Sequence, residues 1–163
     1  MIETTVPLPM LKMVGVFMGV TVLIVAGIAG FAYFWPEVEL PNSLGTATSI
    51  GAALAAGQFA AKRTRRLLTG REKLTFAALA TATSFLAVVG FLWALFAYYG
   101  VPFTMMGLLT ALFGKLPDAG LMGALPWIAL FAVAVSLLVI YFFVGLGAKQ
   151  HLKMLERQAA KGK

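Results

Sequence analysis

The sequence predicts an all-α integral membrane protein, a four-helix bundle with an interfacial helix between its third and fourth spans. The composition is 61% hydrophobic and only 12% charged, whereas average soluble domains carry roughly 25% charged residues. Long stretches carry no charge, and the cations gather at their ends. The length of 163 residues suits one membrane domain, 1–163.

Four uncharged stretches are the predicted spans, at residues 13–35, 44–61, 74–99 and 127–146. A helix rises about 1.5 Å per residue, so the first stretch reaches about 35 Å and crosses a hydrocarbon core of roughly 30 Å. It ends in an aromatic cluster, Phe31 to Trp35. Such clusters are typical of the membrane–water interface.

The second stretch is the least hydrophobic of these four. It consists mostly of Gly, Ala, Ser and Thr, and Ser49, Ala53 and Gly57 follow each other on one face at intervals of four. A lipid-facing helix would carry more Leu, Ile and Phe. We therefore expect a central helix that packs on its neighbours through small residues.

Two further features are candidate packing contacts. Gly15 and Gly19 form a G-x-x-x-G pair in the first span, although glycine is also tolerated in membrane helices without such a role. Gln58 either hydrogen-bonds to another helix or extends to the nearby interface. The predicted helix-packing residues are Gly15, Gly19, Ser49, Ala53, Gly57 and Gln58.

Basic segments set the predicted topology. The loop 62–73 holds six of the thirteen Lys and Arg residues, and the tail 148–163 holds five more. With Lys12, twelve of these cations fall on one side of four spans and Lys115 alone on the other. This asymmetry predicts a multi-pass protein of the bacterial inner (cytoplasmic) membrane, with both termini cytoplasmic.

Two connecting segments have predicted local structure. Thr69 and Glu72 fit a capping box that starts the third span. The outer segment 100–126 is broken by Gly and Pro but stays apolar. We expect it to form an interfacial helix, and a re-entrant loop is the alternative. The tail is expected to continue as an amphipathic helix along the inner surface.

The sequence offers little chemistry. It has no cysteine and one histidine, His151, which falls in the charged tail and is expected to be solvated. Metal sites need clustered ligands, and no nucleotide-binding or nucleophile motif is present. No ionisable residue lies deep in a predicted span. Proton-coupled transporters normally need such a residue, so this absence argues against that class. We therefore expect no enzyme activity, no cofactor, no metal and no nucleic-acid partner.

The segment 42–84 resembles an uncharacterised family of small four-pass proteobacterial inner-membrane proteins. The resemblance rests on the Ala- and Gly-rich second span, the Gly57-Gln58-Phe59 sequence, the basic loop, and Glu72 followed by an aromatic residue. It covers about a quarter of the chain. It implies the four-pass topology and no particular activity.

Three functional hypotheses follow. The first is a non-catalytic accessory or assembly subunit that packs against a larger membrane complex, or against another copy of itself. The second is a small oligomeric channel or transporter. The third is an anionic-lipid-binding protein, since polybasic segments attract anionic head groups. Its candidate lipid contacts are Arg63, Arg65, Arg66, Lys149 and Lys153.

Overall fold

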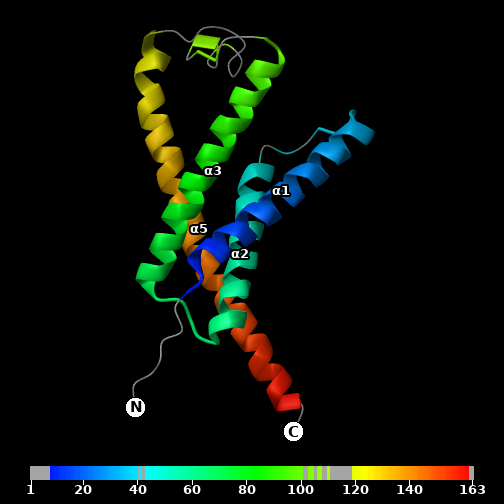
Figure 1. Ribbon diagram of the computed structural model, residues 1–163, viewed down its shortest axis with the longest axis vertical. Helices are drawn as coiled ribbons and strands as arrows, with labels where there is room; N and C mark the ends of the chain where they lie inside the picture. Colours follow the sequence, from blue (N-terminus) through cyan, green and yellow to red (C-terminus); the bar gives the residue numbers. More distant parts are fainter. Residues whose placement is uncertain are drawn as a thin grey trace. The chain divides into compact units, whose positions relative to one another are not determined.

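The computed structural model describes residues 8–39, 41, 43–100, 103–104, 106–107, 110 and 119–161. Its long elements are four helices, shown in Figure 1. They are α1 (Met10–Phe34), α2 (Leu44–Thr64), α3 (Gly70–Tyr98) and α5 (Ala119–Lys161). The predicted all-α class is confirmed.

Three of these helices are long and apolar enough to cross a membrane: α1, α3 and the part of α5 from Met122 to Ala160. This finding supports the predicted membrane class. The helix α2, where the sequence places its second span, is not among them. The reason is its composition of Ala, Gly, Ser and Thr, which leaves few large apolar side chains.

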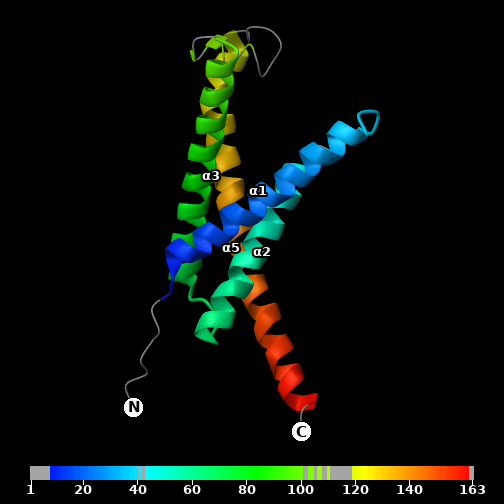
Figure 2. The ribbon, with the colours of Figure 1, turned by 45° about the vertical axis from the view of Figure 1, so that its right-hand side comes forward.

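The chain divides into two compact units. Unit 1 comprises residues Met1–Thr81 and Ser136–Lys163, and unit 2 comprises Ala82–Val135. In unit 1, α1 crosses α2, and the second half of α5 runs beside α2 and continues past its end (Figures 1 and 2). The buried core belongs to this unit. Its members are Met13, Phe17, Ala52, Ala53, Ala56, Ala60, Ala61, Leu68, Phe76, Ala77, Ala80, Ile140, Val144 and Ala148.

The helix α2 continues three residues further than the uncharged stretch, to Thr64, and so includes two of the loop cations. Arg65 ends it in the left-handed conformation, with φ 50° and ψ 28°, and donates its backbone N–H to the Ala61 carbonyl at 2.8 Å. This arrangement is a typical helix C-terminus, usually made by glycine. The connection to α3 is correspondingly short.

The helix α5 is longer than the sequence suggests. It begins at Ala119 rather than at Trp127, with Pro126 inside it, and it passes through Gly145 and Gly147 without a break. Pro126 removes one backbone hydrogen bond near the helix start, and the two glycines are used for close packing described below. The expected span 127–146 and tail 148–163 therefore form one helix as far as Lys161.

Most of the expected outer segment, 100–126, lies outside the described residues. Met106, Gly107 and Thr110 are helical, and the Thr110 hydroxyl donates to the Met106 carbonyl at 2.8 Å. Residues 119–126 belong to α5. Whether this segment lies in the interface or re-enters the membrane stays a prediction.

Unit 2 contains the second half of α3 and the first half of α5. None of its described side chains is buried. Its exposed residues include the large aromatics Phe85, Phe91, Trp93, Tyr98, Trp127 and Phe131. Bulky apolar side chains directed away from the protein are what a lipid-facing surface carries.

Candidate functional site: the α2 seam and the basic loop

A close backbone contact joins α2 and α5 at two glycines. A Cβ atom on Gly57 would overlap the Val144 carbonyl oxygen and lie 3.0 Å from the Ala148 nitrogen. A Cβ on Gly147 would overlap the Leu54 carbonyl oxygen and lie 2.9 Å from the Leu54 Cα. Each helix thus brings a glycine against the backbone of the other, with no room for a side chain at either position. We call this contact the α2–α5 seam.

The buried residues of α2 form two adjacent rows of small side chains. One contains Thr48, Ala52, Ala56 and Ala60, and the other contains Ala53, Gly57 and Ala61. Ser49, expected in the second row, is half-buried and bonds to the Gly45 carbonyl of its own helix. The predicted packing role of Ala53 and Gly57 matches this geometry.

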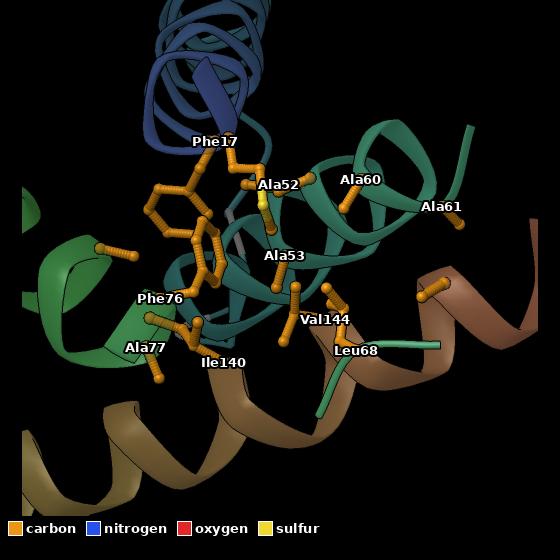
Figure 3. Close-up of a cluster of buried hydrophobic side chains, with 14 residues drawn as sticks. Phe17, Ala52, Ala53, Ala60, Ala61, Leu68, Phe76, Ala77, Ile140 and Val144 are labelled. Carbon is orange, nitrogen blue, oxygen red and sulfur yellow. The ribbon is translucent and has the colours of Figure 1, made fainter. Parts of the chain in front are cut away.

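An aromatic pair packs α1 against α3 within the buried core. The Phe17 and Phe76 rings meet edge to face, with centroids 6.1 Å apart, close to Ala52 of α2 (Figure 3). Both rings are fully buried. The small side chains of α2 leave the space that these rings fill, so large residues on α1 and α3 complement small ones on α2.

The other candidate packing residues make no such contact within the described chain. A Cβ added at Gly15 or Gly19 would meet nothing within 4 Å, because α1 buries Met13 and Phe17 instead. Gln58 is exposed. These three residues lie on open surfaces of unit 1.

The basic loop contains a hydrogen-bonded knot centred on Glu72. Arg66 donates to both carboxylate oxygens, at 2.9 Å and 2.6 Å. The Thr69 N–H donates to the same carboxylate at 2.8 Å, and the Thr69 hydroxyl accepts the Glu72 N–H at 3.3 Å. The predicted capping box is confirmed. Arg66 and Glu72 form an ion pair, and the hydrogen bond to Glu72 raises the pKa of Arg66.

Lys73 makes a contact that the sequence does not reveal. Its aliphatic chain covers Gly145 of α5, where an added Cβ would lie 2.9 Å from both Cε and Nζ. The ammonium lies 5.6 Å from the centroid of the Tyr141 ring, within the range of a cation–π interaction. Lys73 therefore ties the first turn of α3 to α5, and Gly145 provides the space for its side chain.

The remaining described cations of this end are solvent-exposed. Lys62, Arg63, Arg65 and Arg71 surround the loop, and Lys149, Lys153 and Arg157 follow along α5. Arg63 lies over the Phe59 ring at 5.5 Å. Four of the five candidate lipid contacts are thus exposed, and Arg66 is half-buried beside Glu72.

The described residues contain no group of three or more His, Cys, Asp or Glu side chains able to hold a metal ion. His151 is half-buried rather than solvated, and its Nε2 has no hydrogen-bond partner within the described chain. It follows Ala148 and Gly147 at the end of the α2–α5 seam, where packing covers its ring.

Comparison with known proteins finds no matching family model, no matching curated protein and no matching solved structure.

Proposed function

We propose that this protein is an accessory subunit of the bacterial inner membrane, which packs against a larger membrane complex through the outward face of α2. In this proposal the chain crosses the membrane four times, with α2 as its second span and both termini in the cytoplasm. The observation that carries the proposal is the composition of the α2 face left open by the rest of the chain.

After the half-buried Leu44 in the first turn of α2, the open face of this helix carries no large apolar side chain. It consists of Ala47, Ala55, Gln58 and Lys62, which lie on the side opposite the two buried rows. A Cβ added at Gly51, on the same side, would meet only the tip of the Ile24 side chain, at 3.5 Å. Small residues allow another helix backbone to approach closely, and an amide such as Gln58 supplies an interhelical hydrogen bond.

The lipid-facing character of the other helices provides the contrast. The exposed residues of α1 include Leu11, Val22 and Leu23, and those of α3 include Phe85 and Leu86. These side chains suit hydrocarbon, whereas the α2 face suits protein. The open Gly15 and Gly19 surface of α1 offers a second place for a partner helix, or for another copy of the chain.

The neighbours of α2 support its proposed position within the membrane. It packs on α1 and forms a backbone contact with α5, and both are candidate spans. The cation distribution of twelve to one supports the cytoplasmic placement of the basic loop and of both termini.

The test is gentle purification of the tagged full-length protein from its native membrane. We expect a larger assembly for the native sequence, and its loss for Ala55→Leu or Ala47→Leu, because a bulky side chain separates the helices. Ala87→Leu is the matched control, since Ala87 is exposed on α3 and should leave the assembly intact. Recovery of the native protein alone, with no partner, would contradict the proposal.

A second candidate function is contact with anionic lipid, favoured by the exposure of Arg63, Arg65 and Lys149. Each cation near an anionic membrane surface contributes about 1 kcal/mol. Neutralising Arg63 and Arg65 should reduce the phosphatidylglycerol that co-purifies with the protein. Arg66→Gln is unsuitable for this test because it also breaks the knot with Glu72. Unchanged lipid content in the double variant would reject this role.

A further inference from the structure

We propose that the α2–α5 seam determines on which side of the membrane the N-terminus of this protein lies. The inference rests on the four-span topology proposed above, and it names the contact that holds this topology in place. Two arrangements of the chain compete. They differ in the direction of α1 and in whether α2 crosses the membrane.

The first argument is the weak hydrophobicity of α2. Its uncharged part, residues 44–61, has four large apolar side chains, Leu44, Ile50, Leu54 and Phe59. The other residues are Ala, Gly, Ser, Thr and one Gln. Large apolar side chains supply most of the free energy that inserts a helix into lipid. The composition of α2 therefore gives it a weaker preference for the membrane than α1, α3 and α5 have.

The second argument is the packing of α2 on those helices. Every buried residue of α2 is Ala, Gly or Thr. A Cβ added at Gly147 of α5 would overlap the Leu54 carbonyl oxygen, and the rings of Phe17 and Phe76 lie close to Ala52 (Figure 3). In a bilayer such close approach is what stabilises helix association. Its neighbours therefore hold α2 in the membrane.

The third argument is charge. Lys12 is the only Lys or Arg among residues 1–61, whereas the loop 62–73 and the tail 148–163 hold eleven of the thirteen. Because α3 and α5 separate the loop from the tail, these two segments share a side whether or not α2 crosses. If α2 does not cross, α1 inverts and the N-terminus lies outside. The cation split then changes only from twelve to one to eleven to two, so charge discriminates weakly.

The seam distinguishes the two arrangements. It requires α2 to lie beside α5 within the membrane, so it forms only when α2 crosses. An interaction shifts an equilibrium between two states by the difference in its free energy between them. Weakening the seam should therefore move the N-terminus to the outer side and leave the basic loop and the tail where they are.

Cysteine labelling in spheroplasts of a bacterial host measures the two arrangements in the full-length chain. The native sequence has no cysteine. Glu37→Cys, in the exposed connection after α1, is the reporter of α1, and Gln158→Cys, on the exposed end of α5, is a separate reporter of the tail. A membrane-impermeant maleimide labels outer thiols in intact spheroplasts and all thiols after lysis. The two signals together give the ratio of outer to inner thiol.

In the native chain we expect Glu37→Cys to be labelled from outside and Gln158→Cys to be protected. Gly147→Leu should lower the outer-to-inner ratio of Glu37→Cys roughly tenfold or more, because it overpacks the seam. Gln158→Cys should stay protected. Because Gly147 belongs to α5, this substitution leaves the hydrophobicity of α2 unchanged. The matched control is Gly123→Leu on the same helix, where an added Cβ meets nothing within 4 Å.

Two further variants separate a change of topology from a loss of fold. Lys12→Glu removes an exposed cation without touching the seam, and it should shift the reporter in the same direction. Thr4→Lys and Thr5→Lys, added to Gly147→Leu, should return the reporter to the outside, because cations before the first span keep the N-terminus inside. Charges at the N-terminus would not restore a chain that had lost its fold.

Native labelling of Glu37→Cys in Gly147→Leu would overturn the inference and leave the four-span topology intact. Failure of the two added lysines to restore the native pattern would also overturn it. Protection of Glu37→Cys in the otherwise native chain would contradict the four-span topology itself, and the inference with it. The native chain and the seam variants thus distinguish failure of the proposed topology from failure of this inference.

Discussion

Unit 1 and unit 2 use apolar residues in opposite ways. In unit 1 the buried core combines alanines and glycines of α2 with Phe17, Phe76 and Val144 from three other helices. In unit 2 every described side chain is at least partly exposed, and large aromatics predominate on its surface. The comparison shows that hydrophobicity alone does not indicate burial in this chain. The least hydrophobic helix is the most buried.

The physical reason is the solvent. In a bilayer, large apolar side chains gain nothing from leaving lipid for another apolar surface, so close packing and hydrogen bonding drive helix association. Alanine and glycine allow the closest backbone approach. Equivalent substitutions in the two units should therefore differ in their effect on stability, which thermal unfolding in mild detergent measures.

The largest effect is expected at the α2–α5 seam. Gly57→Ala or Gly147→Ala places a methyl group against backbone atoms that cannot move aside, so we expect a loss of about 3 kcal/mol or more. The control is Gly90→Ala in unit 2, where an added Cβ meets nothing within 4 Å. There the change should be neutral or stabilising by up to about 1 kcal/mol. Similar melting temperatures for Gly57→Ala and Gly90→Ala would invalidate the comparison.

The next effect concerns two phenylalanines of α3. Phe76 is fully buried against Phe17, whereas Phe85 is 63% exposed in unit 2. Phe76→Ala should destabilise the protein by about 3–5 kcal/mol, since it removes contacts and leaves a cavity. Phe85→Ala should cost less than about 1 kcal/mol. Equal losses at the two sites would mean that unit 2 has a core of its own.

A smaller effect is expected in the basic loop. Glu72→Ala removes both the capping interaction and the ion pair with Arg66, and we expect a loss of about 1–2 kcal/mol. Glu72→Gln should lose less, because glutamine also serves in a capping box. Glu156→Ala is the matched control on exposed α5 and should change the melting temperature little. An equal shift in Glu156→Ala would show that general charge, not the knot, matters.

The smallest effect is expected at Arg65. Its positive φ of 50° is unfavourable for any side chain, and glycine relieves this strain. Arg65→Gly should therefore stabilise unit 1 by up to about 1 kcal/mol, offset in part by the greater freedom of glycine in the unfolded chain. Arg63→Gly, inside the last turn of α2, should destabilise it by a similar amount.

Much of the packing follows from the sequence. The spacing of Ala53 and Gly57, with few large residues around them, predicts a central helix, and Thr69 with Glu72 predicts the start of α3. Both depend on local rules of spacing and capping. The α2 row of Thr48, Ala52 and Ala56 follows the same logic and is visible as a second small-residue periodicity.

Other features depend on distant segments and so leave no local signal. Gly145 and Gly147 suggest a weakened helix end, but α5 continues through them because Lys73 and Leu54 occupy the space. Arg66 looks equivalent to its basic neighbours until its pairing with Glu72 is known. Gly15 and Gly19 have the spacing of a packing face, and α1 presents a different face to α2 and α3.

The seam has a consequence for synthesis. Gly57 emerges from the ribosome well before Gly147, the other glycine of the seam, because most of α3 and α5 lies between them in the sequence. At a translation rate of ~5–20 residues per second, the seam residues of α5 are synthesised on the order of ten seconds after those of α2. During that interval only α1 and α3 are available to cover the small-residue rows of α2. The helix with the largest share of buried residues in the folded protein is therefore synthesised well before the helix that completes its packing.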